Sequence, residues 1–228
     1  MRNDLNINYC AQGSQEWYAE RCGTITGSKA SKFMGSKLVS TNYINQKKAE
    51  RVFGLSQEEM DKFAAYMAYE SPESQMFELK GEPLNFRYGH ICEPIARLYY
   101  EKKYGETVRE CGFIRLDEII GCSPDGLLNG KDGGVEFKNF VSLSQHYTAS
   151  LMQTTADLKS SFEEYYWQVV TCLYVTGMEY WDFVAFNCNP ALSPEHAMSC
   201  LVVYAADVQK DIYALKERCD TYRDFLTK

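Results

Sequence analysis

The chain has 228 residues, of which 45% are hydrophobic and 24% charged, and its formal net charge is −7. These values are typical of a soluble globular protein with a real core and predict a single domain over residues 1–228. The acidic balance argues against a protein that coats DNA without specificity, because such proteins are usually basic, although a local basic groove can still bind DNA. No apolar run approaches the roughly 20 residues that cross a bilayer, and the first residues lack an apolar signal core. We therefore expect a cytoplasmic protein with no membrane partner.

The cysteines point to the same compartment. There are nine of them, an odd number, and none forms a Cys-x-x-Cys pair. This pattern predicts free thiols in a reducing environment and argues against a zinc ribbon. The count alone does not exclude a four-cysteine iron–sulfur site, but no ferredoxin-like spacing is present.

Two short helices are predicted near the start, Ser14–Arg21 with Ser14 as N-cap and Ser28–Met34 closed by Gly35. The segment before the second helix is rich in hydroxyl groups, and the N–H groups of a helix start can bind an anion. Arg21 is near enough in sequence to add a guanidinium. The sequence leaves the other interpretation open, which is a capped helix with a surface arginine.

Two further helices are predicted over Thr41–Phe53 and Ser56–Tyr69. This part of the chain is more basic than the rest, which fits either a solvated helical face or one wall of a groove that contacts phosphates. The basic residues are Lys29, Lys32, Lys37, Lys47, Lys48 and Arg51.

A longer helix is predicted over Leu84–Tyr104, and it contains Pro94. Proline is tolerated near the first turn of a helix or at a kink, which places Glu93 at the break, one turn before Arg97. Glu93 is then either a carboxylate that interacts with the helix dipole or a carboxylate delivered to a metal ion.

The second half of the chain predicts strands and helices that together give an α/β (α+β) fold with helices packed on a sheet. The strands up to the centre are expected to form a mostly antiparallel meander, and the region 142–161 is expected to be part helix and part loop. The predicted strands are Thr107–Leu116, Ile119–Cys122, Val135–Phe140, Tyr180–Asn187 and Ser199–Ala206, and the predicted helices are Phe162–Val175 and Asp207–Leu226.

The most informative stretch is Cys122–Lys138. It places Asp125 before a glycine-rich reversal and then Glu136 and Lys138 on a strand. Alternate side chains of a strand share a face, so Glu136 and Lys138 point the same way and Phe137 points into a core. If the first arm folds back beside the second, Asp125 joins them. Carboxylates suit hard divalent cations such as Mg²⁺ and Mn²⁺, and a nearby lysine can stabilise an oxyanion or orient a water.

These residues resemble the Pro-Asp…Glu-x-Lys signature of the restriction-endonuclease-like nuclease superfamily. The flanking blocks Trp17 to Ser28, Tyr88 to Glu93 and Trp167 to Thr176 occur in the order found in the lambda exonuclease group, the YqaJ-like alkaline exonucleases of phage recombination. The resemblance covers roughly Trp17 to Phe186 and implies a restriction-endonuclease-like core, a central mixed sheet flanked by helices.

For the metal site, the resemblance implies that Asp125, Glu136 and the backbone carbonyl of Phe137 bind two Mg²⁺ ions, with Mn²⁺ as the other candidate. It further implies that Glu93 reaches the second ion. The chain departs from other members directly after the lysine, where Asn139 and Phe140 follow.

The other site residues implied by the resemblance are Lys138, which would orient or activate the attacking water, and Gln168, which would support it. Arg21 and Ser28 would bind the terminal 5′ phosphate of DNA. This assignment agrees with the anion pocket that the helix start suggests.

The activity that the resemblance implies is Mg²⁺-dependent 5′→3′ digestion of one strand from double-stranded DNA ends. The remaining 3′ single strand would serve phage recombination by single-strand annealing. A homotrimer and a single-strand annealing protein are the partners implied. Two alternatives stay open: a structure-specific or Cas4-like nuclease of the same fold, and a non-catalytic DNA-end-binding protein.

Overall fold

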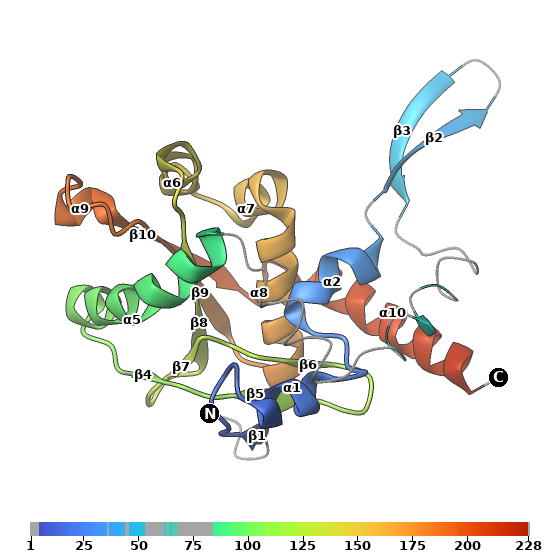
Figure 1. The fold of residues 1–228 in the computed structure, drawn as a ribbon. Coiled ribbons are helices and arrows are strands. Elements are labelled where there is room, and N and C mark those ends of the chain that lie inside the picture. Colours follow the sequence, from blue (N-terminus) through green and yellow to red (C-terminus); the bar gives the residue numbers. More distant parts are fainter. Residues whose placement is uncertain are drawn as a thin grey trace.

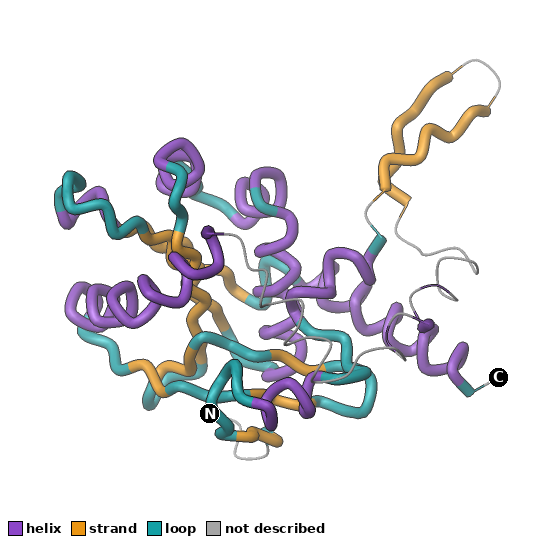
Figure 2. Tube along the Cα trace, in the orientation of Figure 1, coloured by secondary structure: helices purple, strands orange, loops and turns teal. Residues whose placement is uncertain are grey.

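The computed structural model describes residues 5–35, 37–43, 46–52, 62, 64, 65, 67 and 84–227. At its centre lies a five-stranded sheet in the order β10-β9-β8-β7-β4, with helices on both faces (Figures 1 and 2). The chain therefore has the α/β architecture that the sequence predicts, a mixed sheet flanked by helices. The strands are β4 (Val108–Arg109), β7 (Gly126–Leu128), β8 (Gly133–Asn139), β9 (Tyr180–Phe186) and β10 (Met198–Tyr204).

The pairing of β8 with β9 is parallel, whereas the other pairs of this sheet are antiparallel. The expected antiparallel arrangement therefore holds for β4, β7 and β8 and does not extend across the sheet. The reason is the long connection between β8 and β9, because parallel neighbours need a crossover. That crossover consists of α6 (Leu143–Ser150), α7 (Thr155–Ser161) and α8 (Glu163–Thr176).

The two faces of the sheet have separate cores. Helix α5 (Leu84–Tyr104) covers one face, where the ring of Tyr100 lies 5.7 Å from the ring of Phe137. On the other face α8 packs with α2 (Gly27–Met34) and α10 (Gln209–Leu226), and large side chains such as Trp167 are fully buried there. None of the helices in the described ranges is long and apolar enough to cross a membrane.

Close packing between β8 and β9 begins at the Gly133-Gly134 pair. A Cβ atom added at Gly134 would overlap the ring of Trp181, and one added at Gly133 would overlap the ring of Tyr180. The two glycines therefore let two aromatic rings of β9 lie against the start of β8.

A smaller sheet stands beside the large one. It is formed by β1 (Asn6–Asn8), β5 (Phe113–Arg115) and β6 (Gly121–Cys122), with α1 (Gln15–Arg21) next to β5. The expected strand over Thr107–Leu116 is thus divided between β4 and β5, which belong to different sheets. Before β10 the chain forms one short helix, α9 (Pro194–Ala197).

The predicted helix Thr41–Phe53 is wrong where the structure describes it. Strands β2 (Lys37–Tyr43) and β3 (Gln46–Val52) pair as an antiparallel ribbon that projects away from the large sheet (Figure 1). The Lys, Ala and Glu residues of β3 have good helix propensity, but β2 is rich in β-branched and aromatic residues, and pairing with β2 decides the conformation. The predicted helix Ser56–Tyr69 falls mostly outside the described residues; 62, 64, 65 and 67 are helical.

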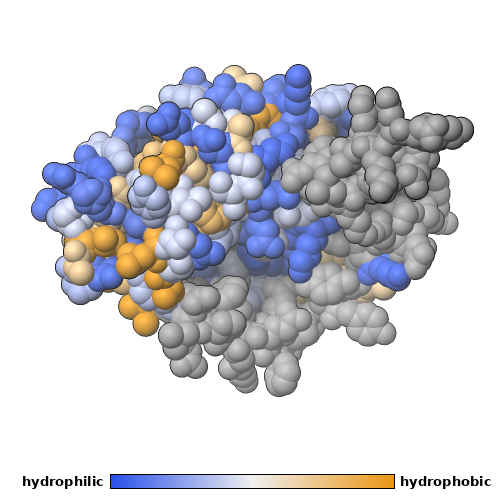
Figure 3. Space-filling view, turned by 90° about the horizontal axis from the view of Figure 1, so that it is seen from above, coloured by the Kyte–Doolittle hydropathy of each residue, from blue (hydrophilic) through white to orange (hydrophobic). Residues whose placement is uncertain are grey.

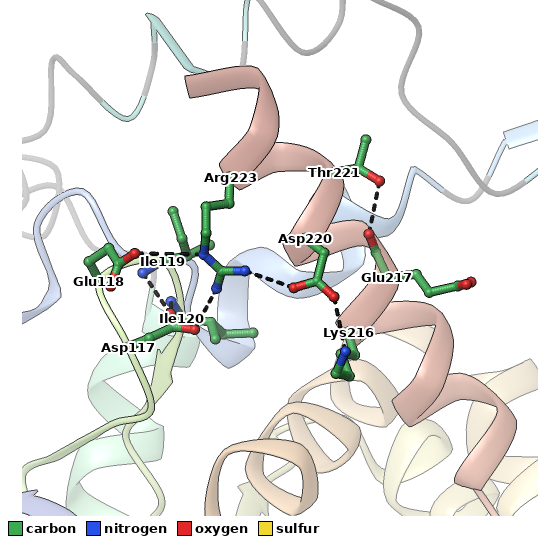
Figure 4. A network of polar contacts seen from close by, with 9 residues as sticks. All are labelled: Asp117, Glu118, Ile119, Ile120, Lys216, Glu217, Asp220, Thr221 and Arg223. Carbon is green, nitrogen blue, oxygen red and sulfur yellow. Dashed lines mark hydrogen bonds and ion pairs between the residues drawn. The ribbon is translucent and has the colours of Figure 1, made fainter. Parts of the chain in front are cut away.

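Helix α10 is fixed to the turn between β5 and β6 by Arg223 (Figure 4). The Arg223 guanidinium forms ion pairs with Asp117 at 2.7 Å, with Asp220 of its own helix at 2.7 Å and with Glu118 at 3.6 Å. Partly exposed ion pairs contribute little each. Here the two carboxylates of the turn, Asp117 and Glu118, share one guanidinium that Asp220 of the helix also binds, and together they hold α10 against the turn.

The turn held by Arg223 supports the N-terminal segment. The Oδ1 atom of Asp117 accepts hydrogen bonds from the backbone N–H groups of Ile119 and Ile120, at 2.8 and 3.0 Å (Figure 4). Ile120 forms a parallel bridge with Ile25, and Ile25 N–H donates to the Ile119 carbonyl at 2.8 Å. The chain is thereby attached to the small sheet just before α2 begins.

The expectation that every cysteine remains a thiol is wrong for one pair. Cys92 of α5 and Cys188, two residues after β9, form a disulfide with Cα atoms 6.4 Å apart, and the other seven cysteines stay reduced. The sequence could not indicate this pair, because its members are 96 positions apart and meet through the packing of α5 against the sheet.

A buried carboxyl lies on the α5 face of the sheet. Tyr100 Oη donates to Asp182 Oδ2, while Asp182 Oδ1 has no hydrogen-bond partner among the described residues. Burial raises the pKa of Asp182, although the Tyr100 hydrogen bond lowers it in part. An ionised Asp182 in this place therefore costs stability.

The first prediction concerns Asp182→Asn. A carboxyl with a raised folded pKa stabilises the fold when protonated, and this contribution is lost as the pH rises through that pKa. At pH 8 the variant should be more stable than the wild type by roughly 1 kcal/mol, and the difference should shrink on acidification. Urea unfolding at pH 5 and pH 8 measures it, with the exposed Asp224→Asn as control. A variant that is less stable at pH 8 would contradict the assignment.

Candidate active site

The site forms where β7 separates from β8. The register of the two strands pairs Gly126 with Val135 and Leu127 with Gly134, so β8 continues beyond its last residue paired with β7. Asp125, directly before β7, takes the place of a strand: its Oδ2 accepts a hydrogen bond from Phe137 N–H at 2.7 Å. A side chain thus completes this edge of β8.

The same geometry directs the Phe137 carbonyl to the Asp125 side of β8. The N–H and C=O groups of one strand residue point to the same edge, and successive residues alternate. The N–H of Phe140 donates to the carbonyl of Phe186 in β9. By alternation, the backbone groups of Lys138 face β9 and those of Phe137 face the opposite edge, where Asp125 lies.

Glu136 and Lys138 share the face of β8 that lies toward α8, as strand alternation predicts. Lys138 Nζ donates to Glu136 Oε1 at 2.5 Å. The Glu136 side chain is 7% exposed and that of Lys138 is 20% exposed. Phe137 points the other way into the core beneath α5. An anion and a cation are thus held together in a place that water reaches poorly.

The carboxylates of the site destabilise one another. Burial is the largest cause of a raised pKa at Asp125, and the neighbouring carboxylates of Glu136 and Glu93 raise it further. Burial alone would lower the pKa of Lys138, but Glu136 and Asp125 outweigh burial and raise it. Lys138 is therefore a cation at neutral pH, and the site is a buried acidic cluster that this cation compensates only in part.

Gln168 of α8 and Ser28 of α2 reach the same cavity. Helix α2 approaches α8 closely because of Gly27: a Cβ atom there would lie 3.2 Å from Gln168 Cα. The Oε1 atom of Gln168 is buried and has no hydrogen-bond partner among the described residues. A buried amide oxygen in this state is suited to a partner that enters the cavity.

Glu93 lines the cavity from α5, and its carboxylate interacts with an arginine of the same helix. Arg97, one turn later, donates to Glu93 Oε1 at 3.3 Å. In the part of the chain that the structure describes, no group of three or more Asp, Glu, His or Cys side chains has the arrangement of a metal site. The structure therefore brings Glu93 near Asp125 without placing it in one ligand cluster with Asp125 and Glu136.

Arg21 and Ser28, which the sequence suggests as an anion pocket, meet as expected. Arg21 Nη2 donates to Ser28 Oγ at 3.4 Å, and Arg21 Nη1 donates to Ser123 Oγ at 2.8 Å. Ser28 lies at the wall of the cavity that also contains Asp125. The guanidinium thus contacts one hydroxyl at the wall of this cavity and one on the residue two positions before Asp125.

Sequence reasoning did not identify Ser123 and Asn139 as site residues. Ser123 joins Arg21 to the arm that carries Asp125. Asn139 lines the cavity and donates to the Gly89 carbonyl of α5 at 3.1 Å. Ser123 belongs to no periodic pattern, and the alternation of the strand places Asn139 on the side of Phe137, away from Glu136 and Lys138, so no signal in the sequence marked them.

Tyr165, which lies within the predicted helix Phe162–Val175, lines the cavity as well. The centre of its ring lies 5.1 Å from Lys138 Nζ. Tyr165 stands three residues before Gln168, on the same face of α8. This spacing was the signal that could have found it.

The cavity that these residues line has a volume of about 710 Å³. Its wall is formed by the start of β7, the end of β8, the first turns of α6, α8 and α2, and one side of α5. Figure 3 shows a hollow with a hydrophilic surface near the middle of the molecule, seen from above the view of Figure 1. The lining combines charged side chains, among them Glu93, Asp125 and Lys138, with aromatic ones such as Phe140 and Tyr165.

The donor set fits a hard divalent cation. Asp125 and Glu136 offer carboxylate oxygens, the Phe137 carbonyl faces the same side, and the buried amide oxygen of Gln168 belongs to the same cavity. Mg²⁺ and Mn²⁺ prefer such oxygen ligands. A bound cation would also relieve the repulsion that raises the pKa of Asp125.

Comparison with known proteins identifies a family and a fold. The family model described as YqaJ-like viral recombinase domain matches residues 16–179. No curated protein matches the sequence.

Among solved structures, an alkaline exonuclease (LHK-Exo) from Laribacter hongkongensis aligns with a TM-score of 0.60 and 22% identity over 94% of this chain and 96% of its own. The same enzyme in complex with dAMP aligns with a TM-score of 0.61 and 21% identity over 93% and 96%. A phage-related exonuclease from Haemophilus somnus 129PT aligns with a TM-score of 0.55 and 12% identity over 90% and 95%. The chain therefore shares the fold of these exonucleases.

The second prediction concerns Asp125→Asn and Mg²⁺. Removal of this partly buried negative charge should raise the thermal unfolding midpoint in the presence of chelator, because the neighbouring carboxylates then repel less. Mg²⁺ should stabilise the wild type and so raise its midpoint; at a Mg²⁺ concentration of 100 times the Kd for Mg²⁺, the stabilisation should be about 2.7 kcal/mol. Mg²⁺ should have little effect on the variant.

The control for charge alone is Glu217→Gln, on the exposed face of α10. This variant should keep the whole Mg²⁺ shift of the wild type. An undiminished Mg²⁺ shift in Asp125→Asn would show that Asp125 is not a ligand.

Proposed function

Because the chain belongs to the YqaJ-like viral recombinase family, we propose that it is a Mg²⁺-dependent exonuclease that degrades one strand of double-stranded DNA from its ends in the 5′→3′ direction. The product is a duplex with a 3′ single strand, which serves recombination by single-strand annealing. The observation that carries this proposal is the cavity in which Asp125 and Lys138 converge with Glu136 at the edge of β8 that β7 leaves.

Asp125, Glu136 and the Phe137 carbonyl are the groups that would hold the catalytic Mg²⁺, and Mn²⁺ is the other candidate. A second ion would require Glu93 to turn from Arg97 toward Asp125. When bound, such ions lower the pKa of a water and stabilise the charge that develops on the phosphate. The protein supplies the fixed oxygens and excludes bulk water from them.

Lys138 acts as a cation in this proposal. Burial would lower the pKa of Lys138, but the carboxylates of Glu136 and Asp125 raise it while no metal ion is bound. As a cation, Lys138 would donate hydrogen bonds that orient the attacking water and offset negative charge on the scissile phosphate. The ring of Tyr165 beside Lys138 Nζ limits where the ammonium can move.

Gln168 and the anion pocket place the water and the DNA. The buried Oε1 of Gln168 can accept a hydrogen bond from the same water, which fixes its direction. Arg21 and Ser28 would bind the 5′ phosphate of the strand that is being shortened, because a guanidinium and a hydroxyl at a helix start suit a terminal phosphate. The next phosphodiester would then lie over the carboxylates.

The third prediction uses linear duplex DNA labelled at the 5′ or at the 3′ end. With Mg²⁺ the 5′ label should leave early as a mononucleotide while the 3′ label stays on a shortened strand; chelator should stop both. Asp125→Ala and Lys138→Ala should each lower the rate on the order of 10³-fold, since several kcal/mol of transition-state stabilisation are lost.

Lys131→Ala is the matched control for Lys138→Ala, because Lys131 lies in the turn between β7 and β8 and is exposed. Its rate should equal that of the wild type. Cleavage of closed circular DNA, or release of nucleotides unchanged in both site variants, would refute the proposal.

We further propose that the enzyme is a homotrimer, acts in the cytoplasm of a bacterial host and hands its product to a single-strand annealing protein. Support for protein contacts comes from exposed apolar side chains of α5, of α6 and of the residue after α6. They are Ile91, Ile95, Leu98, Tyr99, Leu143, Tyr147 and Leu151. Exposed apolar groups in such number are typical of a contact surface.

The fourth prediction is that sedimentation at working concentration gives a species three times the mass of one chain. Leu98→Asp, among the exposed apolar residues of α5, should lower that mass because a charge cannot be buried there without a partner. Tyr213→Asp, at a similarly exposed place on α10, should not. A wild type that sediments as a monomer would exclude the trimer.

A further inference from the structure

Arg21 lies at the end of α1, in contact with Trp17, Ser28 and Ser123. It donates to Ser123 Oγ at 2.8 Å and to Ser28 Oγ at 3.4 Å, and its guanidinium carbon lies 4.0 Å from the centre of the Trp17 ring. A long arginine side chain has many rotamers, and each contact removes some of them. The ring contact restricts the position of the guanidinium above Trp17, and the hydroxyl contacts restrict its rotation.

Trp17 is in turn held in place by two hydrogen bonds. It lies four residues before Arg21, so both side chains project from the same side of α1. Its Nε1–H donates to the Gly112 carbonyl at 2.9 Å and to Ser123 Oγ at 3.1 Å. Trp17 is partly exposed and belongs to neither of the two buried clusters, whereas its neighbour Tyr18 is buried. Packing of the core therefore does not account for its position.

Ser123 connects this pair to the carboxylate arm. Its Oγ accepts from both Trp17 and Arg21, which uses both of its acceptor positions. The next residue, Pro124, is held through its carbonyl, which accepts from Gln12 Nε2 at 2.9 Å. Asp125 follows directly. The guanidinium of the anion pocket and the carboxylate of the metal site are therefore positioned by one short set of contacts.

We propose that Trp17 is a positioning residue for recognition of the 5′ phosphate. It holds the Arg21 guanidinium against its ring and, through Ser123, at a fixed distance from Asp125. The inference rests on the proposed function, in which Arg21 and Ser28 bind the terminal phosphate. Its consequence is specific: loss of Trp17 should weaken the preference for a phosphorylated end more than it weakens cleavage as such.

The test compares kcat/KM on duplexes with 5′-phosphate and 5′-hydroxyl ends for the wild type, Trp17→Ala, Trp17→Phe and Arg21→Ala. Arg21→Ala should remove the preference for the phosphate. Trp17→Ala should lower kcat/KM on the phosphorylated end about tenfold, with little change on the hydroxyl end. Loss of a residue that holds a ligand in place costs at least about this factor at metal sites. Trp17→Phe keeps a ring but loses the bond to Ser123, so its preference should lie between those of Trp17→Ala and the wild type.

The double variant separates positioning from a general effect. Because Trp17 acts through Arg21, Trp17→Ala added to Arg21→Ala should change the phosphate preference no further. The matched control is Tyr9→Ala, which removes the ring of a second arginine–aromatic pair, 5.6 Å from Arg109, in the same N-terminal segment. It should keep the full preference. Thermal unfolding of each variant shows that it is folded.

The outcomes are distinct. A wild type without any phosphate preference overturns the anion pocket of the proposed function and the role of Trp17 with it. A wild-type preference that Trp17→Ala retains overturns the inference alone. A Trp17→Ala variant that loses activity equally on both ends, with Trp17→Phe restoring both equally, shows a structural role and likewise overturns it.

Discussion

The hydrogen bond from Phe137 N–H to the Asp125 carboxylate is the contact on which the site depends. Strand β7 leaves β8 after the Gly126–Val135 pair, and an open strand edge inside a protein would leave backbone groups without partners. Asp125 satisfies the N–H of Phe137, and the carbonyl of Phe137 faces the same edge. One divergence of two strands thereby supplies a carboxylate and a carbonyl at a fixed spacing, and Glu136 adds a second carboxylate from the preceding residue of β8.

The negative charge of the site explains why this arrangement favours the binding of a cation. Burial and neighbouring carboxylates raise the pKa of Asp125, while Lys138 forms an ion pair with Glu136. One ammonium cannot neutralise both the buried carboxylate of Glu136 and the partly buried one of Asp125, and removal of Lys138 would leave the charge still more unbalanced. The fold tolerates this cost because the strands around the site are fixed elsewhere, by the parallel pairing of β8 with β9 and by the aromatic packing at Gly133 and Gly134.

Sequence reasoning succeeded where local pattern and tertiary packing agree. The alternation along β8 predicted the opposite directions of Phe137 and Lys138, and the pattern over Phe162–Val175 predicted a helix, which the structure shows as α8. It failed where pairing overrides propensity, as in the ribbon of β2 and β3, whose second strand has a helix-like composition. It also could not find Ser123, since a serine before Pro-Asp has no periodic pattern and acquires its role through Trp17 and Arg21, 106 and 102 positions away.

The anion pocket and the carboxylates lie far apart in the sequence. The anion pocket comes from residues before Met34 and the carboxylates of β7 and β8 come from residues after Gly121, so their spacing exists only in the folded chain. The attachments that fix it include the bridge between Ile25 and Ile120 and the shared hydroxyl of Ser123.

An enzyme that removes one nucleotide at a time from a strand end needs a constant distance between the group that holds the end and the groups that cut. If the chain acts as proposed, that distance depends on the backbone pairing of Ile25 with Ile120 and on the side-chain contacts around Ser123. Helix α10 supports this backbone pairing. Arg223 of α10 forms an ion pair with Asp117, and Asp117 accepts hydrogen bonds from the N–H groups of Ile119 and Ile120. The small sheet of β1, β5 and β6 therefore helps to position the candidate active site, although it contains none of the residues proposed to bind the metal.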